Sequence, residues 1–136
     1  VFSNSVLEHV TPEVLAPMMR ESCRVLQPDG LSLHSVNCGD HYAYFDRSIT
    51  QVNYLSYPES RWRWWNNDLQ YQNRLRARDF LALAEGAGFA IPMKWHTARP
   101  HLLEQVSRMA IAPEFAHYPP EQLACTSIDF VAAKPA

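Results

Sequence analysis

Apolar residues recur at helical spacing in three stretches of this chain and form short uninterrupted runs between them. The first periodic stretch predicts a helix that begins at Thr11-Pro12-Glu13, where proline suits the first turn and glutamate suits the positive end of the helix dipole. The turn-forming residues Pro28-Asp29-Gly30 end it. The apolar positions in between share one face of the helix: Val14, Leu15, Met18, Met19, Val25 and Leu26.

The other two periodic stretches predict helices in the second half of the chain. One covers residues 78–87, and Gly88 supplies the left-handed stop that commonly ends a helix. The other opens at Arg99-Pro100 and carries its apolar residues on one side. Both helices are followed by apolar runs, so the chain changes repeatedly from helix to strand.

Apolar runs predict strands over residues 31–36, 89–96 and 127–133, and the opening residues have the character of the end of a buried strand. Pro92 favours an edge position or a strand end, because proline cannot donate a ladder hydrogen bond. Strands that alternate with helices predict an α/β sheet. Residues 38–77 instead combine many aromatic and polar residues without one period, and we expect them to form a lid of short helices and loops.

The composition fits one globular domain over residues 1–136. The chain is 47% hydrophobic and 19% charged, and no apolar run approaches the ~20 residues of a membrane span, so no membrane partner is expected. A formal net charge of −2 provides no general attraction to nucleic acid. The three cysteines are too few and too scattered for a disulfide framework, which predicts reduced thiols and a cytoplasmic location.

Two motifs flank the first predicted helix: "SNSVLEHV" at residues 3–10 before it and "LQPDG" at residues 26–30 after it. Their order resembles the class I methyltransferases that use S-adenosylmethionine, in which these segments are the fourth strand, the next helix and the fifth strand. The resemblance implies the C-terminal half of a Rossmann-like class I methyltransferase sheet, with residues 38–77 as a lid insertion. It also implies that the last strand lies antiparallel between the two strands before it, and that the glycine-rich cofactor loop precedes Val1.

The resemblance further implies where the cofactor and a catalytic base would lie. Ser3, Asn4 and Ser5 would line the methionine portion of S-adenosylmethionine, although a tripeptide of this kind can also serve only to turn the chain. His41 or His9 would accept a proton if the acceptor must lose one, because the pKa of an unperturbed histidine lies near neutrality. His9 at a helix start has the alternative of capping or packing.

Substrate-binding residues are expected at the second strand end and in the lid. Asp40 follows the strand at the mouth of the expected pocket, and Trp64 and Trp65 would shape it. Residues 71–76, followed by "GAGF" at 86–89, resemble a segment of small-molecule methyltransferases, which makes Asn73 and Arg74 candidates for holding a polar or anionic group of the acceptor.

Other chemistry receives less support from the sequence. His34, Cys38, Asp40 and His41 are competent metal ligands, but their spacing matches no zinc motif and a strand would point them in different directions, so no metal site is expected. A hydrolase is disfavoured because neither Ser3 nor Ser5 lies in the Gly-x-Ser-x-Gly pattern of a nucleophile elbow.

A rival from another class remains: a non-catalytic, methyltransferase-like module that binds protein or nucleic acid through the Trp62–Arg78 region. We expect the arginines of that region instead to face water or to pair with Glu59, Asp68 and Asp79. The first strand would have an unpaired edge, which predicts self-association or domain swapping.

Overall fold

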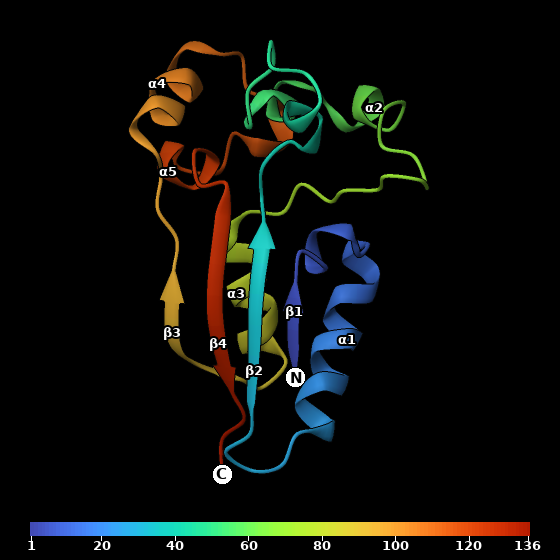
Figure 1. The fold of residues 1–136 in the computed structure, drawn as a ribbon, viewed down its shortest axis with the longest axis vertical. Helices are drawn as coiled ribbons and strands as arrows, with labels where there is room; N and C mark the ends of the chain where they lie inside the picture. The colour runs from blue at the N-terminus through green and yellow to red at the C-terminus, as the bar shows by residue number, and fades with distance from the viewer.

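The computed structural model describes all of residues 1–136 and contains a four-stranded mixed sheet in the order β1–β2–β4–β3 (Figure 1). Its strands are β1 (Phe2–Asn4), β2 (Leu31–Asn37), β3 (Ala90–Trp95) and β4 (Ser127–Ala133). β1 runs parallel to β2, whereas β4 is antiparallel to both β2 and β3. The predicted insertion of the last strand between its two predecessors is therefore confirmed.

One face of the sheet is covered by α1 (Pro12–Val25) and α3 (Ala77–Gly86). Helix α1 begins at Pro12 as predicted, although the side chain of Thr11 makes no capping hydrogen bond. Gly88 has a φ of 97°, the left-handed conformation that its position after α3 requires. The largest buried side chains between helices and sheet include Leu7, Leu15, Met19, Val36, Phe80, Phe89, Ile128 and Phe130.

The opposite face of the sheet has no helix over it and exposes apolar side chains. Leu31 and Leu33 on β2 and Met93 and Trp95 on β3 are each about half exposed, and Phe2 on β1 is 83% exposed. Pro92 lies in β3, an edge strand, where the register shifts between Ala90 and Met93. The predicted edge position of this proline is confirmed.

A cap lies beyond the carboxyl end of β2 and carries a second apolar cluster (Figure 1). As predicted, residues 38–77 fold into short helices: two 3₁₀ helices (His41–Tyr44 and Asn53–Ser56) and α2 (Glu59–Trp62). They do not stand alone, because a later segment packs against them. That segment contains α4 (Pro100–Arg108), a 3₁₀ helix (Pro113–Phe115) and α5 (Pro120–Leu123). Its contributions to the cluster include Leu102, Val106, Phe115 and Leu123.

Arg76 joins this cap to the sheet and corrects one expectation from the sequence. Instead of facing water, its side chain is 0% exposed. Its guanidinium donates to the carbonyl of Cys38 after β2 (2.9 Å), to the carbonyl of Cys125 before β4 (2.6 Å) and to the hydroxyl of Tyr54 in the cap (2.7 Å). Backbone carbonyls at strand ends need partners when they are buried, and Arg76 supplies them.

None of the helices combines the length and the apolar character that crossing a bilayer requires.

Candidate functional site

The carboxyl ends of β1 and β2 lie side by side, because the two strands are parallel neighbours. Ser5 follows β1 with a φ of 52°, and its N–H donates to the carbonyl of Ser35 at 3.0 Å. This left-handed residue turns the chain out of the sheet into a short 3₁₀ helix, Leu7–His9. Ligands of open α/β sheets bind at such strand ends, and here the turn places Glu8 and His9 there.

His9 is held in one tautomer by the lid. Its Nδ1 lies 2.7 Å from the carbonyl oxygen of Tyr71, which can only accept, so Nδ1 carries the hydrogen. In the neutral ring Nε2 is therefore the atom with a free lone pair. His9 is exposed, and the side chain is thus both oriented and accessible. These are the geometric requirements of a general base.

His41 lies next to His9, with 5.0 Å between the ring centroids. The ring of His41 is largely buried, and its Nε2 has no hydrogen-bond partner. Burial, and secondarily the charge of His9, lower the pKa of His41, so this ring is held neutral over more of the pH range than an exposed histidine. The two histidines proposed from the sequence as alternative bases thus form one pair.

Glu8 completes this cluster. Its Oε1 accepts from the backbone N–H of Asn37 at 3.3 Å, whereas Oε2 is buried without a partner. Burial raises the pKa of this carboxyl group. Glu8, His9 and His41 each offer one ligand atom, and these atoms all lie within 4.8 Å of one another. One carboxylate and two imidazoles form a donor set that can hold a divalent transition metal ion.

His34, Cys38, Asp40 and His41, the possible metal ligands noted in the sequence, do not form one cluster in the structure. Both ring nitrogens of His34 are bonded to serine hydroxyls, Nδ1 to Ser3 at 2.7 Å and Nε2 to Ser32 at 2.8 Å. Burial raises the pKa of the Cys38 thiol to about 12, which disfavours the thiolate that binds metals. Glu8 was not predicted as a metal ligand from the sequence, because only the tertiary fold brings it together with both His9 and His41.

The three residues predicted to line the cofactor occupy different environments. The hydroxyl of Ser3 points to His34, so only its backbone is free to contact a ligand. Asn4 and Ser5 are exposed at the end of β1. Their contact with a cofactor stays a prediction.

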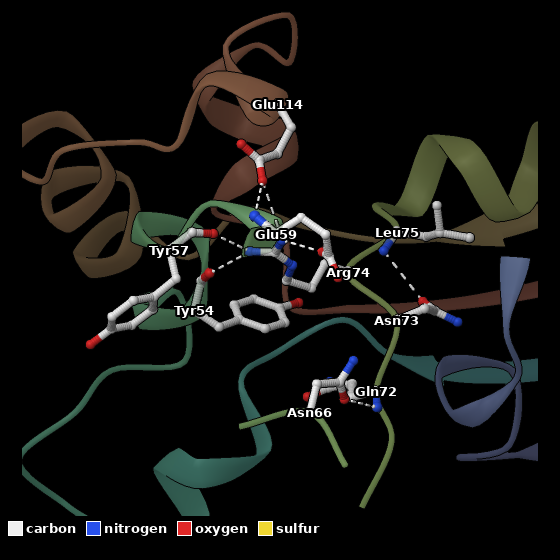
Figure 2. A network of polar contacts seen from close by, with 9 residues as sticks. All are labelled: Tyr54, Tyr57, Glu59, Asn66, Gln72, Asn73, Arg74, Leu75 and Glu114. Carbon is white, nitrogen blue, oxygen red and sulfur yellow. Dashed lines mark hydrogen bonds and ion pairs between the residues drawn. The ribbon is translucent and has the colours of Figure 1, made fainter. Parts of the chain in front are cut away.

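Asn73 and Arg74 have structural partners (Figure 2). The amide nitrogen of Asn73 donates to the carbonyls of Leu7 and Val10, both at 2.8 Å. Figure 2 shows the guanidinium of Arg74 between the carbonyls of the Tyr54–Tyr57 segment and two carboxylates. The carboxylates belong to Glu59 (2.6 Å) and Glu114 (3.4 Å).

The expected substrate role of Asn73 and Arg74 therefore stays a prediction, and their contacts give them a structural one. Both side chains border a cavity of about 470 Å³, but the donors of Asn73 are engaged within the protein and the charge of Arg74 is already paired. The pairing of Arg74 with Glu59 agrees with the sequence, as does the approach of Arg78 to Asp79 at 3.8 Å. Asp68 makes no ion pair.

Asp40 and Trp65 meet at a smaller cavity of about 220 Å³ in the cap. Asp40 caps the His41–Tyr44 helix, because its Oδ1 accepts from the N–H of Tyr42 at 2.9 Å. Its Oδ2 is buried without a partner. Trp64, by contrast, is 78% exposed and does not line this cavity. The residues around the cavity are Asp40, Tyr42, Asp46, Ile49, Asn53, Tyr57, Trp62 and Trp65.

The fold is similar to those of two solved structures. One is a protein of Bacillus halodurans C-125 assigned as a methyltransferase, with a TM-score of 0.53 and 20% identity over 100% of this chain and 69% of that one. The other is phosphoethanolamine N-methyltransferase 2 of Haemonchus contortus in complex with phosphomonomethylethanolamine and S-adenosylhomocysteine. Its TM-score is 0.51, with 18% identity over 100% of this chain and 33% of that one.

No protein-family model and no curated protein sequence matches this chain. Because the sequence identity to the two solved structures is only 20% and 18%, the similarity to them shows the fold alone. The chain has the α/β, Rossmann-like fold of methyltransferases, and the predicted fold class is confirmed.

Proposed function

We propose that this chain is part of an enzyme that transfers a methyl group from S-adenosylmethionine to a small-molecule acceptor. One observation carries the proposal: the whole chain matches the methyltransferase fold, and one of the matched structures holds S-adenosylhomocysteine. The polar cluster at the carboxyl ends of β1 and β2 supports it, because that edge of the sheet is where such folds bind ligands. We also propose that the chain corresponds to the C-terminal half of a class I domain.

The cofactor would lie against the end of β1. Asn4 and Ser5 are exposed there, and Ser5 turns the chain out of the sheet. The bound cofactor supplies a methyl group on an electrophilic sulfonium, so the protein needs to position the acceptor and exclude water. The cap over the same edge is suited to both tasks.

A proton leaving the acceptor would pass to the histidine pair. His9 is the better-placed base, because its Nδ1–H is fixed on the Tyr71 carbonyl and its Nε2 is free. His41, held neutral by burial, lies 5.0 Å away between ring centroids and would receive or orient the same group. A positioned general base contributes roughly 10²–10⁴-fold to such a step.

Binding of S-adenosylhomocysteine to the protein in its full natural length tests this function. We expect calorimetric titration to show binding, and we expect Asn4→Trp to weaken it at least about tenfold, because a large side chain would occupy the end of β1. Asn67→Trp is the matched control, since Asn67 is an exposed lid residue away from the strand ends. A folded protein that does not bind this ligand, or equal affinity in both variants, would contradict the proposal.

The rival function is a module that binds nucleic acid through Trp62–Arg78. In the structure, two arginines of this region are not available to phosphates. Arg74 and Arg76 are buried and engaged, which leaves Arg61, Arg63 and Arg78 exposed. A steep fall of nucleic-acid affinity with salt would favour the rival.

A further inference from the structure

We propose that the 220 Å³ cavity in the cap binds the ammonium group of a small organic cation, which is the acceptor or the methylated product of the reaction. The assignment to the reaction rests on the proposed function, whereas cation binding rests on the cavity alone. Four aromatic side chains and one buried carboxylate surround the cavity, and each feature suits a methylated ammonium group.

The aromatic side chains form walls that stand at steep angles to one another. The ring of Tyr42 meets that of Trp62 at 89° with 6.1 Å between centroids, and that of Trp65 at 80° with 6.5 Å. Tyr57 completes the set. The faces of aromatic rings attract cations, and an ammonium group that carries methyl groups has few N–H donors to satisfy, so such rings can replace its hydration.

Asp40 places a carboxyl group at the cavity, and no cationic side chain of the protein pairs with it. The residue is 2% exposed, and its Oδ2 has no partner although Oδ1 is bonded to the N–H of Tyr42. An unpaired buried carboxylate is costly, and a cation in the cavity would supply the missing partner. Asp46 at the rim adds a second acidic group, and no lysine or arginine lines the cavity.

The nearest protein cation does not occupy this cavity. The guanidinium of Arg74 lies 5.5 Å from the ring centroid of Trp62, but Arg74 borders the larger neighbouring cavity and is paired with Glu59. Trp62 therefore separates the two spaces. Arg74 does not pair with Asp40.

Size and position agree with a head group rather than a whole cofactor. A volume of about 220 Å³ is below the roughly 300–1,000 Å³ of pockets for drug-sized ligands. Asp40, at this cavity, directly precedes His41 of the histidine pair in the sequence.

Choline chloride and dimethylbutanol, its neutral carbon isostere, test the proposal by calorimetric titration of the full-length protein without cofactor. We expect choline to bind at least about tenfold more tightly than the isostere. Asp40→Asn removes the charge but keeps an oxygen for the Tyr42 N–H, and Trp65→Leu removes one aromatic wall. Each should weaken choline binding about tenfold or more.

Two variants control for effects outside the cavity. Asp68→Asn removes the same charge from elsewhere in the lid, and Trp64→Leu removes a neighbouring tryptophan, and both should bind choline like the unsubstituted protein. No choline binding, equal binding of choline and isostere, or equal effects in test and control variants would overturn the proposal. If these tests fail but the protein binds S-adenosylhomocysteine, only the cation site is contradicted. If the protein binds choline but not S-adenosylhomocysteine, the proposed function is contradicted and the cation site is supported.

Discussion

At the residue scale, buried ionisable groups gather at the top of β1 and β2 and along the neighbouring strands. His34 shows most clearly how burial changes the pKa of such a group. It lies in β2, next to Ser3 of β1 and against the ring of Phe130. Burial lowers its pKa to about 4. The folded protein therefore holds this ring neutral at pH values where the unfolded chain binds a proton.

The stability of the protein should depend on pH through His34. Because the unfolded histidine has a pKa near 6.5, the contribution of His34 is fully present above that pH and is lost progressively as the pH falls towards 4. The loss is roughly 3 kcal/mol in the free energy of unfolding. His34→Gln cannot protonate, so its urea-unfolding free energy should fall less between pH 6.5 and 4.

The exposed His101 of α4 provides the control, since His101→Gln should reproduce the original profile. If His34→Gln and the unsubstituted protein lose stability in parallel over this window, His34 is not held neutral by the fold.

At the element scale, the cap is attached to the sheet by long-range contacts that come from one short segment. Arg76 contacts the ends of β2 and β4 and the Tyr54 hydroxyl, while Asn73 contacts the segment after β1. These residues lie just before α3. This irregular segment, residues 71–76, thus fixes the lid over the strand-end site.

Replacing Arg76 should loosen this attachment. Arg76→Lys keeps the charge but cannot donate to three separated oxygens in a planar fork, so buried carbonyls lose their partners. We expect the free energy of unfolding to fall by about 3 kcal/mol in urea titrations. Arg61→Lys, at an exposed position of α2, should change it by less than about 0.5 kcal/mol. Equal stability of the two variants would show that Arg76 does not hold the cap.

Local signals in the sequence were sufficient for most elements of the sheet layer. Pro12 and Gly88 mark helix ends through constraints on their own backbones, and Pro92 marks an edge strand through its missing N–H. The order of the strands came from the resemblance to methyltransferases, because periodicity says nothing about which strands pair.

The candidate site was only partly predictable because its contacts join distant residues. His9 and His41 were identified singly, but their pairing and the bond from His9 to Tyr71, 62 positions away, depend on the fold. The burial of Arg76 carries no local signal, since alternate arginines usually indicate a solvated surface. The cavity at Asp40 likewise requires side chains from separate turns of the lid.

At the scale of the whole molecule, the sheet is covered on one face only. Leu33 is 48% exposed on the bare face, close to Phe2 and Val131 across the strands. Apolar patches of this kind favour association in water, and the edge of β1 offers unpaired backbone groups as well.

This chain of 136 residues should therefore self-associate at micromolar concentration, as measured by sedimentation velocity over a concentration series. Leu33→Glu should shift the distribution towards monomer, because it places a charge within the patch. Val14→Glu changes a residue of α1 with similar exposure, 51%, away from that face, and should leave association unchanged. If the unsubstituted chain is monomeric throughout the series, this prediction is wrong.

The most direct measurement for the central claim is a crystal structure of the full-length protein with S-adenosylhomocysteine. We expect the ligand to lie along residues 3–5, beside the His9–His41 pair. Density for the ligand at another edge of the sheet, with Asn4 and His9 left in solvent, would contradict the assignment of this surface as a methyl-transfer site.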